Sequence, residues 1–449
     1  MLIVKKFGGT SVADKDKIMH VADICVKEYE KGNSVVVVLS AMGKQTDELL
    51  AQAKDINSKA PKREIDMLLT TGEQISVALM AMALDSLGVP AISFNAFQVG
   101  ITTTNHYGNA RIKEIDINPI KHELDKRKIV IITGFQGIND RGDYTTLGRG
   151  GSDTTAVALA AALSADACEI YTDVDGVYTA DPRVIPSARK LDEINHDEML
   201  ELASLGAGVL HNRSVEAAKK FNVPLVVRSS LNNHYGTVVK DKTELEKRVI
   251  KGVAADEDAA CIYIKNIVNN DGAALRVFKY LADRNINTDV ILFSDAQCIN
   301  AVNVVNATSV ANTMEDADTT KVTNAVKAAS STNIINAAGV SNSAKAELAD
   351  LKFLVSKDNL GEAIEILNSL KESLNYGEMA VEEDVSKVSI VGIGVMSDSM
   401  IVPKLFEAFY EEKIPIKMVS TSEIKITVVI DREYTVRAVK AVHDKFMLS

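Results

Sequence analysis

The sequence has few of the features that mark zinc-stabilised, disulfide-rich or nucleic-acid-binding proteins. Its four cysteines, Cys25, Cys168, Cys261 and Cys298, are far apart and form no CxxC pair. This spacing argues against a structural zinc site or a disulfide framework and suits a reducing compartment. Acidic residues outnumber basic ones by 61 to 50, for a formal net charge of −11. The overall balance therefore gives no reason to expect a nucleic-acid partner.

Long hydrophobic segments are also scarce. The chain opens on a strand-like segment, residues 1–7, and no basic region with an apolar stretch precedes it, so we expect no signal peptide. The most apolar run, around Ile75 to Leu87, is broken by Ser76 and Asp85. We interpret it as a buried helix that is too short to span a bilayer. We therefore expect a cytoplasmic protein with no membrane partner.

What is present indicates a globular protein of several domains. The chain has 449 residues, of which 46% are hydrophobic and 25% charged. That balance is typical of folded rather than disordered chains, and the length suggests roughly three domain-sized units.

The first half of the chain alternates apolar runs with helical patterns. Ile18, Val21, Ala22, Cys25 and Tyr29 recur at helical spacing, and the Ala-rich stretch 154–163 predicts a second, closely packed helix. The predicted buried strands are Leu2–Val4, Ser34–Leu39, Ile129–Ile132, Cys168–Tyr171 and Pro224–Val227. This alternation predicts an α/β fold, a mostly parallel sheet sandwiched by helices, with ligands beyond the carboxyl ends of the strands.

The C-terminal part contains an internal repeat at one constant offset. Residues Phe278, Leu281, Ile286, Val290 and Ser294 align with Phe406, Phe409, Ile414, Met418 and Ser422. Each copy is predicted to run strand, helix, strand, then a turn (Ser294-Asp295 or Ser422-Glu423) into another strand. We therefore expect two small α+β units. The segment between them, 306–350, is rich in Ala, Asn, Ser and Thr, and we assign it no function.

The first of three glycine-containing turns is Lys6-Phe7-Gly8-Gly9-Thr10. Paired glycines let backbone N–H groups approach an anion, and Lys6 would add a positive charge beside them. A purely structural turn explains the same residues equally well. The phosphate loop GxxxxGK[ST] and the dinucleotide turn GxGxxG do not occur here.

The second turn, residues 145–156, opens a predicted helix. Ser152 or Asp153 would be its N-cap. Arg149 stands among three glycines, which offer few side chains to pair with it, and arginine favours forked contacts with carboxylate or phosphate. The alternative is that Arg149 is a solvated loop cation.

The third turn, residues 172–183, follows a predicted buried strand. Its spacing does not fit a calcium loop, and Asp175-Gly176 and Asp181-Pro182 are good turn formers. A plain loop explains these pairs, but the aromatic residue and the arginine could also hold an adenosine ring and its phosphates.

Taken in order, five motifs resemble the aspartokinases of the amino-acid kinase superfamily. They are KFGGTSV at the start, SAMG at Ser40–Gly43, TTGE at Thr70–Glu73, GRGGSDTTA at 148–156 and TDVDGVYTADPR at 172–183. The two repeat units resemble ACT regulatory domains. The resemblance implies a catalytic domain (1–245), a first ACT-like unit (246–305), an insertion (306–350), a connecting segment (351–385) and a second ACT-like unit (386–449).

The resemblance also implies roles for individual residues. Lys6 and Asp153 would be catalytic, and no residue is expected to form a resident metal site. The substrate residues would be Thr46, Glu73, Arg149 and Ser152, with Glu73 facing the substrate ammonium and Arg149 its α-carboxylate. The nucleotide residues would be Lys6, Gly8, Gly9, Thr10, Ser40, Thr172, Asp173, Tyr178 and Arg183.

Some of these positions have a competing explanation or depart from the family pattern. Glu73 would also suit a capping box with Thr70. Gly208 stands where the family commonly has a nucleotide-binding lysine. His211 is expected to be structural rather than a catalytic base.

The expected chemistry is transfer of a phosphoryl group from ATP, with Mg²⁺, to the β-carboxylate of L-aspartate. That carboxylate is already ionised near neutral pH, so charge neutralisation rather than a general base is required. Glutamate or acetylglutamate as acceptor, and a non-catalytic amino-acid sensor, are the alternatives.

The ACT-like units imply feedback regulation and a homodimer or larger assembly. Asp289, Ser294 and Asp295 would form the regulatory site, with lysine and/or threonine as effector. The alternative is that Asp289 and Asp295 are only turn residues.

Overall fold

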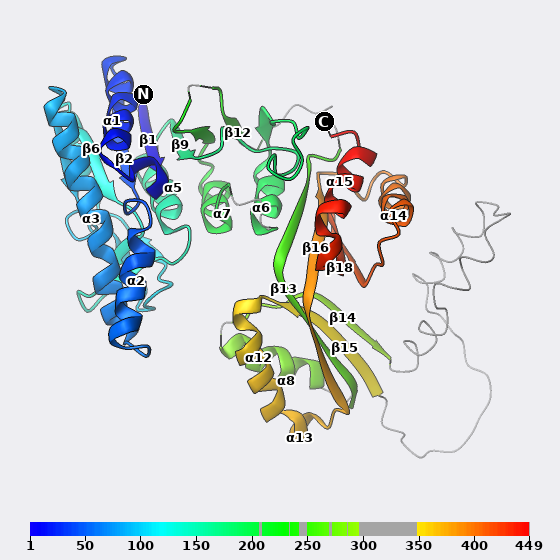
Figure 1. The fold of residues 1–449 in the computed structure, drawn as a ribbon. Coiled ribbons are helices and arrows are strands. Elements are labelled where there is room, and N and C mark those ends of the chain that lie inside the picture. Colours follow the sequence, from blue (N-terminus) through cyan, green and yellow to red (C-terminus); the bar gives the residue numbers. More distant parts are fainter. Residues whose placement is uncertain are drawn as a thin grey trace, which may run out of the picture.

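The computed structural model describes residues 1–205, 209–232, 234–241, 249–268, 272–284, 286–295 and 348–448. Figure 1 shows an N-terminal half built on one large sheet and a C-terminal half built on another, joined where strand β13 begins. The predicted α/β fold followed by α+β units is confirmed.

The N-terminal half contains an eight-stranded sheet of order β10-β12-β11-β9-β1-β2-β6-β3. The pairings from β11 through β3 are all parallel, and the β11–β12 pairing is antiparallel. The strands are β1 (Leu2–Phe7), β2 (Ser34–Leu39), β3 (Ala91–Phe94), β6 (Ile129–Thr133), β9 (Ala167–Thr172), β10 (Glu193–Ile194), β11 (Leu225–Ser229) and β12 (Thr237–Val239). All five predicted strands are present.

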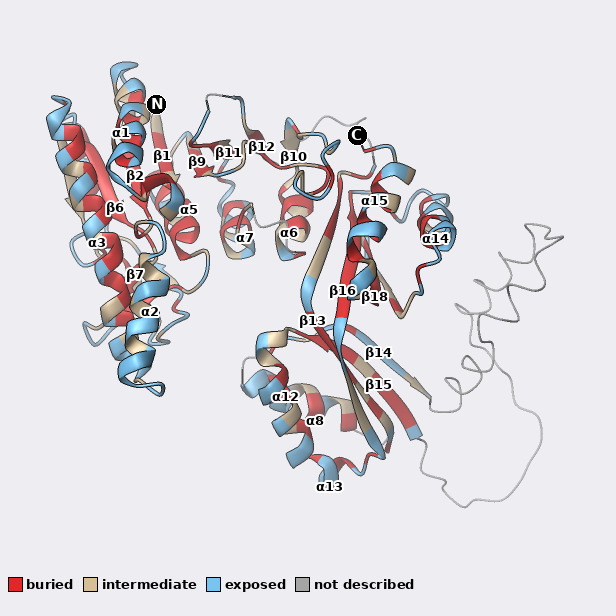
Figure 2. Cartoon of the chain, viewed as in Figure 1, coloured by how far each residue is buried: buried red, intermediate tan, exposed pale blue. Residues whose placement is uncertain are grey.

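Helices cover both faces of this sheet because its central strands are apolar on both sides. In β2, Val35 and Val37 pack under α1 (Lys15–Glu30) and α3 (Lys62–Ser86), whereas Val36 and Val38 belong to the core on the opposite face. That second face is covered by α4 (Asn118–Asp125), α5 (Gly151–Leu163), α6 (His196–Ser204) and α7 (Asn212–Phe221). In Figure 2 buried residues line the inner sides of these helices.

Three further features near the sheet were not predicted. A four-stranded sheet joins β5 (Ile112–Glu114), β4 (Thr102–Thr103), β7 (Gln136–Ile138) and β8 (Tyr144–Thr146), and it leads into the second glycine turn. A short 3-10 helix, η1 (Gly9–Val12), follows the first glycine turn. Helix α2 (Gln45–Ile56) has no buried residue and lies outside the core.

A buried ion network joins the central strands beneath α1. The Lys5 ammonium, whose side chain is 1% exposed, forms an ion pair with Glu169 and lies 3.5 Å from Glu28. It also donates a hydrogen bond to the Tyr171 hydroxyl at 3.2 Å, and Arg228 pairs with Glu169 at 3.0 Å. These pairs hold the pKa of Glu169 below its ordinary value, despite its burial. Each charge in the network has an opposite charge beside it.

Lys5→Met is therefore expected to destabilise the N-terminal half, because it leaves buried carboxylates without their ammonium. Loss of one partner from a buried ion pair costs about 3–5 kcal/mol. The measurement is the shift in the thermal unfolding midpoint. Lys17→Met is the matched control, since it removes an exposed pair with Asp14 that is worth roughly 0–1 kcal/mol. Equal shifts in the two variants would contradict a structural role for the network.

The C-terminal half is one antiparallel sheet of order β14-β15-β13-β16-β18-β17. Its long strands β13 (Gly252–Val268) and β16 (Glu378–Val391) pair along most of their lengths and run through both repeat units. One core lies at the end that contains α8 (Ala273–Asp283), β14 (Asp289–Asp295), β15 (Leu348–Val355), α12 (Lys357–Ser369) and α13 (Lys371–Leu374). The other lies at the end that contains α14 (Ile401–Glu411), β17 (Met418–Thr421), β18 (Lys425–Asp431), η2 (Arg432–Tyr434) and α15 (Thr435–Lys445).

The internal repeat is confirmed, because α8 and β14 correspond to α14 and β17 at the predicted offset. The second predicted turn is present, with the Ser422 N–H donating to the Lys425 carbonyl at 2.8 Å. The first is wrong: Ser294 and Asp295 are strand residues of β14, paired in register with Asp350 and Ala349. Strand β15, the last strand expected for the first unit, supplies that pairing. It begins at Leu348, within the expected insertion, whose residues 306–347 lie outside the described residues.

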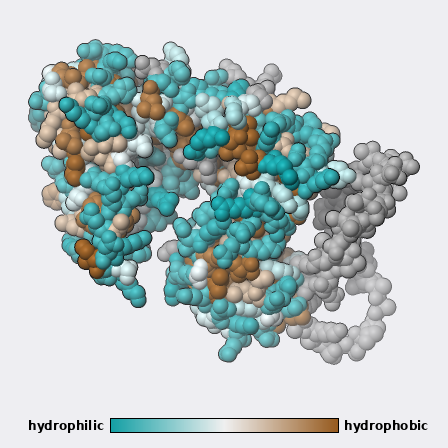
Figure 3. All heavy atoms as spheres, in the orientation of Figure 1, coloured by the Kyte–Doolittle hydropathy of each residue, from teal (hydrophilic) through white to brown (hydrophobic). Residues whose placement is uncertain are grey.

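Helix α3 is longer than the sequence suggested. It spans 25 residues rather than the short run predicted, and it is the one helix among the described residues that is long and apolar enough to cross a membrane. Half of that apolar stretch, 50%, is buried within the protein, and the core helix of a soluble protein passes the same test of length and composition. The surface in Figure 3 is mainly hydrophilic, with small separate hydrophobic patches.

Candidate active site

The carboxyl ends of β1, β2 and β9 meet at one edge of the large sheet, because these strands are parallel and adjacent. Near this edge the Lys6 ammonium lies 2.6 Å from the Asp153 carboxylate of α5, and both side chains are 12% exposed. The two atoms are close but poorly aligned for a hydrogen bond. The first glycine turn and the second glycine turn are thereby joined by an ion pair.

A cleft of about 840 Å³ opens at this pair. It is lined by seven of the predicted site residues, namely Lys6, Ser40, Thr46, Glu73, Arg149, Ser152 and Asp153. They come from β1, the residue after β2, the start of α2, the middle of α3, the loop before α5 and the first turn of α5, so distant parts of the sequence contribute to one concave surface. Lys6 and Arg149 both face this shared cleft.

Glu73 is the most perturbed acid in the cleft. It lies in the middle of α3, is 2% exposed, and accepts a hydrogen bond from the Ala41 N–H at 3.1 Å through Oε1. Its second oxygen, Oε2, has no hydrogen-bond partner among the described residues. Burial raises the pKa of Glu73 to about 7. A buried, half-satisfied carboxylate beside a cleft is suited to receive a cation.

The capping-box explanation for Glu73 is wrong. Helix α3 begins at Lys62, so Thr70 and Glu73 are interior helical residues rather than a first turn. The Thr70 hydroxyl instead donates to the Met67 carbonyl at 3.0 Å.

Glu73→Gln is expected to raise the free energy of unfolding of the ligand-free protein, relative to the unchanged protein, more at pH 8 than at pH 5. A carboxyl whose folded-state pKa lies above its ordinary 4.5 contributes stability at low pH, and that contribution is lost as the pH rises through about 7. Glutamine carries no such penalty, so its advantage should grow by roughly 2–3 kcal/mol between pH 5 and pH 8. Denaturant unfolding at both pH values measures this difference.

Glu48→Gln on the exposed face of α2 is the control, and it should show no such growth. If Glu73→Gln and the unchanged protein lost stability in parallel between these pH values, Glu73 would not be ionising inside the folded protein.

The loop before α5 differs from its predicted geometry at one point. The N-cap is Gly150, with a left-handed φ of 68°, and not Ser152 or Asp153, which lie within the first turn. Gly150 approaches His211 so closely that a Cβ at this position would lie 2.2 Å from the imidazole Cγ. His211 in turn is the N-cap of α7 and accepts from the Arg213 N–H at 3.4 Å. These contacts support the structural role expected for His211.

Arg149 is exposed on this loop and has no ion-pair or hydrogen-bond partner among the described residues. Its guanidinium therefore remains available to a ligand in the cleft. A merely solvated loop cation has no need of a concave site, whereas Arg149 lines one.

Two positioning residues were missed by the sequence analysis. The buried Asp66 carboxylate of α3 accepts from the N–H groups of Gly108 and Thr146, both at 2.9 Å, and from the Thr146 hydroxyl at 2.8 Å. The Arg213 guanidinium donates to the carbonyls of Leu147 and Ala110. Both hold the segments that form the cleft wall, and nothing in the local sequence pattern marks either residue.

The first glycine turn has a clear structural role at one of its two glycines, and its contact with phosphate stays a prediction. Gly9 is required structurally, because a Cβ there would lie 2.6 Å from the Ala41 carbonyl oxygen. At Gly8 the nearest atom to an added Cβ is the Lys6 ammonium, 3.6 Å away, so the backbone beside that charge is open. Thr10 is exposed. Gly8, Gly9 and Thr10 are outside the residues that line the cleft.

The remaining nucleotide candidates lie further along the sheet edge. Thr172 ends β9, and its carbonyl accepts from the Ser230 N–H at 3.1 Å. Its hydroxyl donates to Asp173 at 2.9 Å. Because β9 pairs with β1, Thr172 lies beside the first glycine turn.

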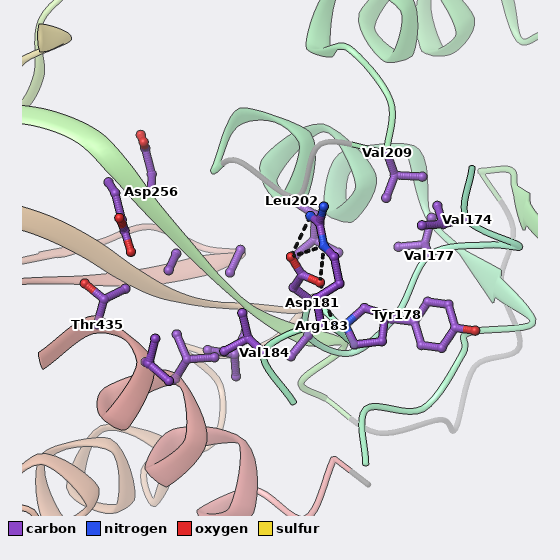
Figure 4. Close-up of a pocket in the computed structure, with 18 of the residues that line it drawn as sticks. Val174, Val177, Tyr178, Asp181, Arg183, Val184, Leu202, Val209, Asp256 and Thr435 are labelled. Atoms are coloured by element: carbon purple, nitrogen blue, oxygen red, sulfur yellow. Dashed lines mark hydrogen bonds and ion pairs between the residues drawn. The ribbon is translucent and has the colours of Figure 1, made fainter. Parts of the chain in front are cut away.

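Tyr178 and Arg183 line a second cavity, of about 410 Å³, between the third turn, β13 and α15. Figure 4 shows Arg183 paired with Asp181, with the Tyr178 ring extending away from that pair. The Tyr178 hydroxyl donates to Asp175 at 2.6 Å, a bond that raises the pKa of Tyr178 to about 12. The structure does not bring these two residues into the cleft with Lys6. Gly208 lies outside the described residues.

The predicted regulatory residues are at the edge of the C-terminal sheet. Asp289 lines a cavity of about 240 Å³ together with Asn287 and Thr288. Its carboxylate pairs with the Lys387 ammonium at 3.0 Å, which also pairs with Asp256 at 2.9 Å. The cation beside Asp289 is therefore supplied by the chain itself.

Comparison with known proteins accounts for the cleft and the repeats together. Residues 1–229 match the amino acid kinase family, and residues 388–446 match an ACT domain. An aspartokinase from Bacillus sp. strain MGA3 is 44% identical over 449 residues, which cover 100% of this chain and 98% of that protein. The chain belongs to the aspartokinase family.

Two solved structures have the same fold. E. coli aspartokinase III in complex with aspartate and ADP, in its R-state, is 24% identical with a TM-score of 0.76, covering 100% of each chain. The same protein in complex with lysine and aspartate, in its T-state, is 25% identical with a TM-score of 0.68, covering 99% of each chain. The family assignment confirms the amino-acid kinase fold with ACT domains expected from the five motifs.

A resident metal site is not evident from the acidic residues. Among the described residues, no group of three or more His, Cys, Asp or Glu side chains is placed to hold a metal ion. The cleft does contain carboxylates, but Asp153 is paired with Lys6 and Asp66 is fully hydrogen-bonded.

Proposed function

We propose that this chain transfers the γ-phosphoryl group of MgATP to the β-carboxylate of L-aspartate, forming 4-phospho-L-aspartate, the first step toward lysine, threonine and methionine. The observation that carries the proposal is one cleft lined by a lysine, by an arginine with no partner among the described residues, and by a buried glutamate. That set complements the three charged groups of aspartate and the phosphates of ATP.

The aspartate would be held at its α-carbon by two opposite charges. Arg149 would form a forked contact with the α-carboxylate. Glu73 would receive the α-ammonium, whose approach lowers the pKa of that carboxyl again and keeps it ionised. Thr46 and Ser152 would add hydrogen bonds, and Ser152 is 7% exposed at the start of α5.

The transfer itself would depend on charge neutralisation. The β-carboxylate of free aspartate has a pKa near 4 and attacks as the anion, so no side chain must remove a proton. Lys6, held by Asp153, would balance the charge on the transferring phosphoryl oxygens, and the N-terminus of α5 would add its favourable dipole.

Mg²⁺ would enter with ATP, since phosphates and water supply most of its ligands in such complexes. ATP would extend from the Lys6–Gly8 turn across Thr172 and Asp173, at the start of the third turn, toward Tyr178. Ser40, Gly9, Thr10, Tyr178 and Arg183 stay predicted nucleotide residues.

The charge pattern also favours aspartate over the alternative acceptors. Acetylglutamate has an amide in place of the ammonium, so its binding would lack the ion pair that aspartate forms with the buried Glu73 carboxylate. Glutamate retains the ammonium but is one methylene longer, so discrimination against it would be weaker.

Trapping the product with hydroxylamine tests the reaction. An acyl phosphate reacts with hydroxylamine to give a hydroxamate, so aspartate, MgATP and the protein should yield aspartyl hydroxamate in step with ADP. Release of ADP without hydroxamate would show that water, rather than the β-carboxylate, receives the phosphoryl group.

We also propose feedback by an amino acid, lysine and/or threonine, in a homodimer or larger assembly formed through the ACT-like units, in the cytoplasm. A complex of E. coli aspartokinase III with lysine supports the first of these effectors. At Asp289 an effector ammonium would compete with Lys387. Titration of lysine and of threonine during turnover tests this proposal, and activity that responds to neither would contradict it.

A further inference from the structure

The third turn is anchored to the C-terminal end of the chain through one hydroxyl, that of Thr179. The turn forms a short β-ribbon, in which the Thr179 N–H donates to the Arg189 carbonyl at 2.9 Å and the Leu191 N–H donates to the Val177 carbonyl at 2.8 Å. Thr179 is 1% exposed and directly follows Tyr178, the candidate nucleotide residue. Figure 1 shows α15 and the C-terminus beside this turn.

Three groups contact the Thr179 hydroxyl oxygen. The Arg189 N–H donates to it at 3.0 Å, it donates to the Leu448 carbonyl at 3.0 Å, and His443 Nε2 lies 3.0 Å away. A hydroxyl has one proton and two lone pairs, and its proton goes to the carbonyl, which can only accept. His443 must therefore donate from Nε2.

The surroundings of His443 agree with this assignment. The residue is 0% exposed on α15, and burial lowers its pKa below the ordinary value, so the ring is neutral and carries one proton at pH 7. Its other nitrogen, Nδ1, has no hydrogen-bond partner among the described residues, and the Asp444 carboxylate lies 3.9 Å from it, beyond hydrogen-bond distance. With the proton on Nε2, all three bonding positions of the Thr179 hydroxyl are filled.

The backbone beside Thr179 is fixed by the same half of the protein. The Val253 N–H of β13 donates to the Thr179 carbonyl at 2.7 Å. Helix α6, at the other side of the 410 Å³ cavity, is held by a hydrogen bond from the Ile393 N–H to Glu198 at 3.0 Å and by an ion pair between Lys425 and Glu201 at 2.7 Å. The second ACT-like unit thus holds two walls of the cavity that Tyr178 lines.

We propose that His443 and the Leu448 carbonyl are positioning groups for nucleotide binding, which act through the Thr179 hydroxyl on the third turn. The inference rests on the proposed function, because that function assigns the third turn to the nucleotide. The second ACT-like unit then has a constant structural role in the nucleotide site, separate from any effector.

Direct binding of ADP, with hydrogen exchange of residues 177–191 in the nucleotide-free protein, tests the proposal. Thr179→Val keeps the shape of the side chain and removes the hydroxyl. It should weaken ADP binding by roughly tenfold, as expected for the loss of a buried hydrogen-bonded group, and it should speed exchange in the ribbon. Thr179→Ser retains the hydroxyl and should restore both.

The same comparison can be made from the other side of the contact. His443→Gln offers an N–H donor at comparable reach and should behave like Thr179→Ser, whereas His443→Leu should behave like Thr179→Val. The two His443 variants test the positioning role if Thr179→Val does not fold. In turnover, Thr179→Val and His443→Leu should each raise KM for ATP about tenfold and leave KM for aspartate within about twofold of the unchanged protein.

The possible outcomes separate this inference from the proposed function. If the unchanged protein bound no ADP, the nucleotide assignment itself would fail. If the unchanged protein bound ADP and Thr179→Val and His443→Leu bound it equally well, only the positioning role would be overturned. A lower melting temperature with equal rises in both KM values would also overturn it, since that result indicates general destabilisation.

Discussion

Lys6→Ala is expected to lower kcat by roughly 10²–10³, because the variant loses a positive charge that acts on the transferring phosphoryl group. Lys6 contributes little to holding aspartate, a role that is assigned to Glu73 and Arg149. Aspartate binding should therefore change by no more than about threefold, the pattern of a residue that acts mainly in the transition state. Steady-state turnover together with direct aspartate binding measures both quantities.

Two comparisons sharpen the test of Lys6. Lys59→Ala removes an exposed lysine from a distant loop and should leave kcat unchanged. Lys6→Ala also leaves the Asp153 carboxylate without its partner at the cleft, so Lys6→Ala/Asp153→Asn should not recover turnover if the ammonium itself is needed. Turnover within about twofold of the unchanged protein would rule out the role assigned to Lys6.

Arg149→Ala is expected to raise KM for aspartate by about 10- to 100-fold, since a charge-assisted contact to a carboxylate contributes roughly 1.5–3 kcal/mol. KM for ATP should change far less. Arg149→Lys should recover only part of the loss, because an ammonium cannot make the forked contact of a guanidinium. Initial rates over a matrix of aspartate and ATP concentrations separate the two KM values.

Arg141→Ala is the matched control for Arg149. Arg141 is an exposed arginine of a neighbouring loop and does not line the cleft. An Arg149→Ala protein whose aspartate KM matched that of Arg141→Ala would show that Arg149 is a solvated cation.

Much of the large sheet could be predicted because its strands carry a strong local signal. The β2 run of four valines is buried on both faces, a pattern that indicates a central parallel strand. Because the strands are parallel, the glycine turns at their carboxyl ends lie at one edge of the sheet. The contact between Lys6 and Asp153 follows from that geometry.

Local sequence patterns gave wrong predictions where the same short pattern fits two different structures. Thr70 and Glu73 match a capping box, but the same spacing occurs within any helix, and the start of α3 at Lys62 decides between them. Ser152 and Asp153 are good N-cap residues, but Gly150 takes the cap position because His211 leaves no room for a side chain there.

Other features had no local signal because their partners are remote in sequence. Asp66 bonds to Thr146, 80 residues away, and Thr179 bonds to His443, 264 residues away. In the C-terminal half the repeat was visible at α8 and α14, but its constant offset placed the counterpart of β18 directly after β14, whereas β15 begins at Leu348. Such contacts follow from the packing of whole elements rather than from any short motif.

One cleft would bring Lys6, which is assigned to the phosphates, and Arg149 and Glu73, which are assigned to aspartate, to the same reacting atoms. Release of ADP from MgATP, measured separately with L-aspartate, L-glutamate and N-acetyl-L-glutamate, tests this most directly. We predict rapid release with aspartate, slow release with glutamate and none above background with acetylglutamate. No aspartate-dependent release, or faster release with acetylglutamate, would contradict the account.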